Sequence, residues 1–191
     1  MTSFPIVAVV GLTGAFGGSL ARELAGLGYP VRALVRSGNA TPAQTGGHPM
    51  TVIKGDATVG ADLEALMAGA DILVWGLNVP YAQWPAVVPA ASRLAFDIAA
   101  RLKVTIVFPG NVYGLGRADY TAPGPLDEDA PKIATSKKGR LRNELEAMLE
   151  DATTRGARAI VLRAGDFFGG PDHGTWFSHM LAKVNKGGPI L

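Results

Sequence analysis

Three glycines at three-residue spacing, Gly11, Gly14 and Gly17, follow directly on an apolar run that ends at Val10. This order predicts a buried strand that turns sharply into a helix. The first glycine allows the tight turn, the second leaves room for a phosphate group, and the third lets the helix pack closely on the sheet. The N–H groups at such a helix start attract an anion. Glycine triplets also occur in purely structural turns, so the rest of the chain has to separate the two interpretations.

Short apolar runs alternate with segments of helical periodicity along the chain. Near-continuous apolarity over about five residues is typical of a strand covered on both faces. Strands that alternate with helices imply parallel pairing and right-handed crossovers. The sequence therefore predicts an α/β fold, a doubly wound parallel sheet (Rossmann fold) of about six strands with helices on both faces. The predicted strands are 6–10, 31–35, 51–54, 72–75, 105–108 and 159–162.

Apolar stripes define the predicted helices between these strands. Two long helices are expected over about 84–102 and 137–154, and two shorter ones follow the first and third strands. Residues that recur every three or four positions share one helix face. The predicted inner faces are Leu20, Leu24 and Leu27 in the first helix, Leu63, Leu66 and Met67 in the next, and Leu141, Leu145, Met148 and Leu149 in the last.

Composition fits one globular domain over residues 1–191, with 48% hydrophobic and 18% charged residues. The net charge of +2 is small and the cations are scattered apart from 137–142, so no nucleic-acid partner is expected. With no cysteine, disulfides, thiolate metal sites and a cysteine nucleophile are excluded. Asp172, His173 and His179 do not share a helical face, so we expect no metal site.

Targeting signals are also missing from the sequence pattern. The N-terminal apolar stretch has no Lys or Arg before Arg22, unlike a signal peptide. The most apolar later window, 85–102, carries Arg93, Asp97 and Arg101 and does not read as a membrane span. We therefore expect a cytoplasmic protein with no membrane partner.

The residues at the end of the second predicted strand indicate whether NAD or NADP fits the site better. An NAD site usually places Asp or Glu about twenty residues past the glycines, where it holds the ribose 2′-hydroxyl. This chain has no carboxylate from Val31 to Ser37, and it has Arg36. A guanidinium there can pair with the 2′-phosphate of NADP, and the alternative is a solvated charge at a strand end. The sequence favours NADP, with NAD as the second choice.

Later strand ends are expected at the same edge of the sheet. Asp56 ends the third strand and can accept a hydrogen bond from an adenine amino group, or it caps the turn before the next helix. Small residues after the fourth strand would let a cofactor pass across the sheet. The predicted cofactor-binding residues are Gly11, Thr13, Gly14, Ala15, Phe16, Gly17, Arg36, Asp56, Ala57, Gly76, Leu77, Asn78, Pro109 and Gly110.

Four segments, in the right order, together resemble the extended short-chain dehydrogenase/reductase superfamily, specifically the NAD-dependent epimerase/dehydratase family. They are the glycine segment 11–17, the pair 55–56, the segment Phe108-Pro109-Gly110-Asn111-Val112-Tyr113-Gly114, and the segment 162–169. The resemblance covers nearly the whole chain. It implies NAD(P) binding and hydride transfer at a carbonyl or hydroxyl carbon of a small or sugar-like substrate.

The chain departs from the family's pattern after the fifth strand. The family usually has Ser-Ser-x-x-Val-Tyr-Gly, in which the second Ser orients the substrate. Counting back from Tyr113, this chain has Pro109 in its place. The resemblance then leaves Asn111 and Tyr113 facing the substrate. Tyr113 is either a displaced proton donor or part of the aromatic wall.

The family's Tyr-x-x-x-Lys signature is incomplete as well. No tyrosine stands four residues before Lys137, Lys138 or Arg140. In the family the lysine binds the nicotinamide ribose and lowers the tyrosine pKa. We assign that cationic role to Lys137, with Lys138 and Arg140 as alternatives and a solvated helix start as the structural interpretation.

Family members continue into a small C-terminal lobe that shapes the substrate pocket. The stretch 183–191 resembles the lead into a further strand, so we expect a fragment or a shortened form with this lobe largely missing or reduced. The helices from Trp84 and Lys137 are those that the family pairs across a dimer axis, which predicts a homodimer. Two functions remain open: an NADP-dependent oxidoreductase or epimerase-like enzyme acting on a small-molecule substrate, and a non-catalytic NAD(P)-binding sensor.

Overall fold

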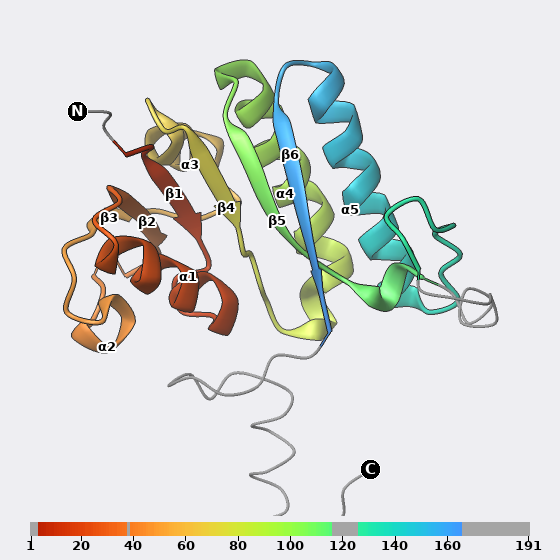
Figure 1. The fold of residues 1–191 in the computed structure, drawn as a ribbon, viewed down its shortest axis with the longest axis horizontal. Helices are drawn as coiled ribbons and strands as arrows, with labels where there is room; N and C mark the ends of the chain where they lie inside the picture. The colour runs from red at the N-terminus through yellow and green to blue at the C-terminus, as the bar shows by residue number, and fades with distance from the viewer. Residues whose placement is uncertain (1–3, 38, 116–125, 166–191) are drawn as a thin grey trace, which may run out of the picture.

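The computed structural model describes residues 4–37, 39–115 and 126–165 (Figure 1). Six parallel strands form one sheet in the order β3-β2-β1-β4-β5-β6. The chain builds outwards from β1 through β2 to β3, and then returns to add β4 on the other side of β1. The strands are β1 (Val7–Val10), β2 (Val31–Val35), β3 (Thr51–Lys54), β4 (Ile72–Trp75), β5 (Thr105–Asn111) and β6 (Arg158–Ala164). This confirms the predicted doubly wound fold.

Helices cover both faces of the sheet in the described part of the chain. In Figure 1, α1 lies on one face, and α4 and α5 lie side by side on the other. The α-helices are α1 (Ala15–Gly26), α2 (Pro42–Thr45), α3 (Gly60–Met67), α4 (Trp84–Leu102) and α5 (Lys137–Thr154), and two short 3-10 turns are η1 (Tyr81–Gln83) and η2 (Val112–Gly114). Both long helices have the bounds that their apolar stripes predict.

Alternate side chains of the central strand enter two separate cores. Val7 and Val9 pack with α1, whereas Ala8 and Val10 pack with the layer of α3, α4 and α5. The second core is the larger, and its buried aromatic rings are linked edge to face: Phe96 lies 6.1 Å from Trp75 and 6.3 Å from Phe108 between ring centroids. The two cores hold the carboxyl ends of β1, β4 and β5 in fixed relation.

The inner face of α1 differs from the prediction. Leu27 is 65% exposed and lies past the end of the helix. The buried positions are the small residues Gly17, Gly18, Ala21 and Ala25, while Leu20 and Leu24 are half-buried beside them. Small residues let the helix backbone approach the sheet, and the leucines pack along its flanks. By contrast, Leu63, Leu66, Met67, Leu145 and Leu149 are buried as predicted.

Strands β5 and β6 are longer than their apolar runs predict. They pair with each other over their whole length, from Thr105 opposite Arg158 to Asn111 opposite Ala164. Backbone pairing thus extends the strands through Pro109 and Gly110, which sequence propensity disfavours. As a result, Asn111 lies at the end of a strand that projects past its neighbour β4.

Several sequence expectations lie outside the described residues: those on 166–169, on Asp172, His173 and His179, and on 183–191. Among the residues that the structure describes, no cluster of three or more His, Cys, Asp or Glu side chains is arranged to hold a metal ion. Within that same part of the chain, none of the helices has the length and apolarity needed to cross a membrane.

Candidate functional site

The glycine turn brings β1, α1 and β4 together backbone to backbone. Gly11 has a φ of +92°, a conformation that favours glycine, and its carbonyl accepts a hydrogen bond of 2.9 Å from the N–H of Gly14. A Cβ on Gly11 would collide with the carbonyl of Gly76 at the end of β4, and one on Gly17 would lie 2.5 Å from the Gly11 oxygen. The turn therefore requires glycine at both positions for structural reasons alone.

Gly14 is different from the other two glycines. It is the N-cap residue of α1 with extended backbone angles, and a Cβ there would meet only the Gly11 oxygen at an ordinary 3.4 Å. No side chain of the described residues caps α1, and its first turn carries no acidic residue. A helix start without a side-chain acceptor, behind a glycine that exposes it, fits a phosphate group.

Two cavities adjoin the glycine turn, one on each side of the switch point between β1 and β4. The first, of about 490 Å³, lies over the ends of β2 and β3 and is lined by Gly11, Thr13, Arg36, Asp56 and Ala57 among others. The second, of about 260 Å³, lies over the ends of β4 and β5 and contacts Gly14 to Gly17. Leu77 and Asn78 line both cavities. Ligands of open α/β sheets bind at this place.

Asp56 and Arg36 stand at the two strand ends that border the first cavity. Asp56 Oδ1 accepts hydrogen bonds from the backbone N–H and the hydroxyl of Thr58, at 2.8 Å and 2.7 Å. These two bonds, with a smaller contribution from the charge of Arg36, hold the pKa of Asp56 below its ordinary value. Asp56 thus has the capping role that was one of its two interpretations. Arg36 is exposed on the cavity wall.

The second cavity has a mixed wall of aromatic rings and backbone. Its aromatic side chains include Tyr81, Trp84 and Phe108, and β5 contributes Pro109 and Gly110. Trp84 is held in place by a hydrogen bond of 2.8 Å from Nε1 to the Val79 carbonyl. The predicted cofactor-binding residues Ala15, Phe16 and Gly76 also line this cavity.

Asn111 and Tyr113 lie together at the mouth of the second cavity. The side-chain oxygen of Asn111 accepts a 3.0 Å hydrogen bond from the backbone N–H of Tyr113 and so caps η2. Tyr113 lines the cavity and is 37% exposed, so its ring borders both the cavity and solvent. Asn111 therefore has a structural task, whereas Tyr113 presents its side chain to the cavity.

The three cations at the start of α5 have different surroundings. Lys137 is exposed and does not line either cavity. Lys138 places its Nζ 3.6 Å from the centroid of the Tyr81 ring, on the wall of the second cavity. Arg140 is exposed and donates to the Thr135 carbonyl. Ser136, four residues before Arg140, uses its hydroxyl to cap the helix by accepting from the Gly139 N–H.

Arg142 is a cavity residue that the sequence analysis did not single out. Its guanidinium carbon lies 4.7 Å from the ring centroid of Trp84 and 5.6 Å from that of Phe108. Nη1 donates to the Pro109 carbonyl at 3.4 Å. Burial lowers the pKa of Arg142, although nearby oxygen-bearing side chains act in the opposite sense. Its position in the sequence could have indicated this, because Arg142 stands three residues before Leu145 and seven before Leu149 and so shares the inner face of the helix.

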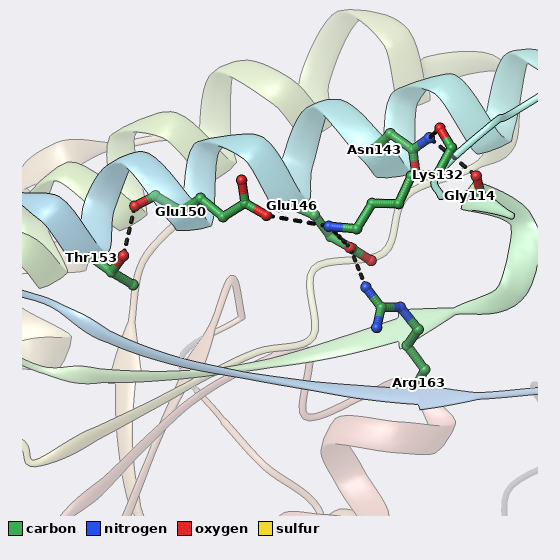
Figure 2. A network of polar contacts seen from close by, with 7 residues as sticks. All are labelled: Gly114, Lys132, Asn143, Glu146, Glu150, Thr153 and Arg163. Atoms are coloured by element: carbon green, nitrogen blue, oxygen red, sulfur yellow. Dashed lines mark hydrogen bonds and ion pairs between the residues drawn. The ribbon is translucent and has the colours of Figure 1, made fainter. Parts of the chain in front are cut away.

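A polar network joins α5 to its neighbours (Figure 2). The buried carboxylate of Glu146 pairs with Lys132 at 2.9 Å and with Arg163 of β6 at 2.6 Å. Partial burial alone would lower the pKa of Lys132, but Glu146 and the exposed Glu150 raise it above its ordinary value. This network fixes the segment before α5 against the sheet edge.

Together the sheet order and the glycine turn define a doubly wound Rossmann fold, with two cavities at its switch point. Residues 5–91 match the model of the NmrA-like family, a stretch that begins just before β1 and ends inside α4. No curated protein matches the chain.

Solved structures of similar fold are enzymes with bound NAD. The Bordetella bronchiseptica enzyme WbmH in complex with NAD+ superposes with a TM-score of 0.77 and 17% identity, over 97% of this chain and 63% of that one. A dTDP-glucose 4,6-dehydratase from Bacillus anthracis in complex with NAD gives 0.76 and 16%, over 98% and 63%. A UDP-glucose 4-epimerase from Brucella ovis in complex with NAD gives 0.65 and 21%, over 83% and 51%.

These similarities show that the chain shares the fold of these structures. The chain spans about three fifths of the length of the first two of these structures and about half of the third. What the longer proteins bind and convert is a property of those proteins.

Proposed function

We propose that this chain is the NADP-binding domain, residues 1–191, of an oxidoreductase or epimerase-like enzyme. The observation that carries the proposal is the pair of cavities that meet at one glycine turn. A dinucleotide has two nucleoside halves joined by a pyrophosphate, and the two cavities with the helix start between them offer three matching compartments. The backbone contacts at Gly11, Gly17 and Gly76 leave no room for side chains where the pyrophosphate would approach.

Each compartment has an assigned part of the cofactor. The pyrophosphate rests on Gly14 to Gly17, and the adenosine lies in the cavity of about 490 Å³. Arg36 pairs with the 2′-phosphate of NADP, since that wall presents a cation where an NAD site has a carboxylate. The nicotinamide lies in the other cavity beside Leu77, Pro109 and Gly110.

The reaction class follows from the cofactor and from the cavity residues. When bound, the nicotinamide supplies or accepts a hydride at a carbonyl or hydroxyl carbon. Tyr113 gives or takes the matching proton at its phenolic oxygen, and Asn111 fixes the turn that carries it. Lys137 is the predicted ribose contact; Lys138, beside Tyr81, is the alternative that stands nearer the cavity. The proposed substrates are small or sugar-like, and nucleotide sugars are included because the dTDP-glucose 4,6-dehydratase and the UDP-glucose 4-epimerase share the fold.

Turnover separates the enzyme from a non-catalytic sensor. The sensor is favoured because two residues of the family's catalytic set are missing. Pro109 stands in the place of the Ser, and no tyrosine precedes the cations of α5: Ser136 is the residue four positions before Arg140, and its hydroxyl caps the helix. NADPH oxidation is measured with aldehydes, ketones and nucleotide sugars for the wild type, Tyr113→Phe and the control Tyr29→Phe. Tyr29 packs on Phe4, with ring centroids 4.5 Å apart, and lines neither cavity. Turnover lost only in Tyr113→Phe supports the enzyme, and tight binding without turnover supports the sensor.

Location and assembly are separate proposals. We place the protein in the cytoplasm, and we propose a homodimer through the outer faces of α4 and α5, which pack against each other in the described chain. Sedimentation at micromolar concentration tests the dimer, and a monomer would contradict it.

A further inference from the structure

The guanidinium of Arg142 lies between aromatic rings and forms few hydrogen bonds to the described residues. Trp84 and Phe108 lie within 4.7 Å and 5.6 Å of its central carbon, and its one hydrogen bond to a described residue is the long contact to the Pro109 carbonyl. Its Nε is enclosed and has no acceptor among the described residues. An arginine carries five N–H donors, so this guanidinium has donors to spare for a ligand in the cavity.

No described carboxylate neutralises this charge through an ion pair. Glu146, one helical turn further along α5, is committed to Lys132 and Arg163. Arginine keeps its charge in proteins, so Arg142 is a half-buried cation with only partial access to water. Burying a charge without an anionic partner is unfavourable, and the stacked rings compensate only part of that cost.

Arg142 is also the charged residue in the lining of the cavity of about 260 Å³, whose other described lining residues are apolar, aromatic or uncharged. A ligand in this cavity that carries a negative charge would complete the missing ion pair. A guanidinium binds carboxylate and phosphate groups equally well in geometry. A carboxylate carries one negative charge and balances the one charged residue of this described lining, whereas a phosphate monoester carries about −1.5 to −2 at neutral pH.

We propose that Arg142 is the anchor for a carboxylate group of the substrate, in a subsite between Trp84, Tyr81 and Phe108. The inference rests on the proposed function, because the subsite lies in the same cavity as the proposed nicotinamide position. It narrows the substrate from any carbonyl or hydroxyl compound to a small acid whose carboxylate is held beside aromatic rings. Arg142 orients the substrate through this charge.

Paired probes test the subsite directly. Benzoate and benzamide have the same ring and nearly the same shape and differ in charge, and phenyl phosphate offers a different anion. Calorimetric titrations use the wild type, Arg142→Met, Arg142→Lys and the control Arg158→Met, each with and without saturating NADPH. Arg158 is an exposed arginine at the opposite, amino end of the sheet. Methionine preserves most of the packing on Trp84 and Phe108 without the charge.

We expect the wild type and Arg158→Met to bind benzoate about tenfold or more tightly than benzamide, and more tightly than phenyl phosphate. Arg142→Met should bind the two ring compounds within about twofold of each other, and Arg142→Lys should keep a reduced preference. The inference is overturned if Arg142→Met keeps the full preference, if the wild type has none, or if phenyl phosphate is preferred.

NADPH titrations on the same samples test the proposed cofactor binding separately from the proposed role of Arg142. Unchanged NADPH affinity in Arg142→Met shows that the variant is folded and that Arg142 acts on the second ligand. Absence of NADPH binding to the wild type would remove the proposed function, while the benzoate preference without cofactor still decides the role of Arg142. If Arg142→Met does not fold, the wild-type preference and its reduction in Arg142→Lys remain decisive.

Discussion

Arg163 on β6 and Glu146 on α5 form an ion pair with 2.6 Å between Nη2 and Oε2, and the carboxylate is 6% exposed. Lys132 shares the same oxygen at 2.9 Å. One buried carboxylate therefore pairs with two cations from different parts of the chain, one helical turn along α5 from Arg142. Glu146 therefore acts on Arg142 only through its charge and forms its ion pairs with Lys132 and Arg163.

Replacing Glu146 with Gln should lower the free energy of unfolding by about 1–3 kcal/mol, because Lys132 and Arg163 lose their shared partner. The loss is smaller than for a fully buried pair, since both cations keep some contact with water, at 32% and 26% exposure. Urea unfolding measures the change. The control is Glu150→Gln, whose carboxylate is 74% exposed and binds the same lysine, and it should change stability by less than about 1 kcal/mol. Equal losses for both variants would contradict the central role of Glu146.

Alanine at Gly14 should separate binding from folding. The free protein accommodates this Cβ at 3.4 Å from the Gly11 oxygen, so the melting temperature should stay close to that of the wild type. The methyl group would point at the proposed pyrophosphate position, so NADPH affinity should fall about tenfold or more. Gly17→Ala is the matched variant, and it should lose stability and binding together because its Cβ would lie 2.5 Å from a backbone oxygen. Unchanged NADPH affinity in Gly14→Ala would mean that the phosphates bind elsewhere.

Alanine at Arg36 should discriminate between the two dinucleotides. A charge-assisted hydrogen bond to the 2′-phosphate is worth about 1.5–3 kcal/mol, so NADP should bind more weakly by that amount while NAD changes little. Lys54, an exposed cation at the end of β3 that does not line the cavity, provides the control Lys54→Ala. Competitive titration with both dinucleotides gives the ratio. Equal losses for NADP and NAD would remove the assignment of NADP.

The pKa of Asp56 makes a prediction on acid stability. Because the folded state lowers this pKa from 3.8, the stabilising effect is present above that pH and is lost as the pH falls through the folded value. Thr58→Ala removes the hydroxyl donor while the backbone N–H remains. The pKa of Asp56 in this variant should rise towards its ordinary value, measured by NMR titration of the carboxyl carbon. A pKa that does not move would show that the hydroxyl contributes nothing.

Sequence patterns predicted the sheet because the buried strands are short apolar runs with no competing interpretation. Val31–Val35, Thr51–Lys54 and Ile72–Trp75 have the bounds that were expected. The packing face of α1 was wrong, since leucine periodicity suggested Leu27 whereas the close backbone approach at the glycine turn buries Gly17 and Ala21. Periodicity indicates which residues are apolar, but the distance between helix and sheet decides which of them are buried.

The candidate site was predicted in part. The glycine turn and the strand ends around Asp56 and Gly76 come together at the two cavities. Arg142 was missed because it belongs to a run of cations that resembles a solvated helix start. Its burial depends on Trp84 and Phe108, which come from other elements, so it appears only when α4, α5 and β5 are assembled.

Asn143 on α5 holds two distant backbone segments in place. Its side-chain nitrogen donates to the carbonyl of Gly114 and to that of Lys132, at 3.1 Å and 2.9 Å (Figure 2). A single amide on α5 thus ties down the chain both before and after residues 116–125. With both anchor points clamped to one rigid helix, an insertion, deletion or graft between them would leave the cavity wall where it is. The length of the connection between Gly114 and Lys132 can therefore change without rebuilding the scaffold.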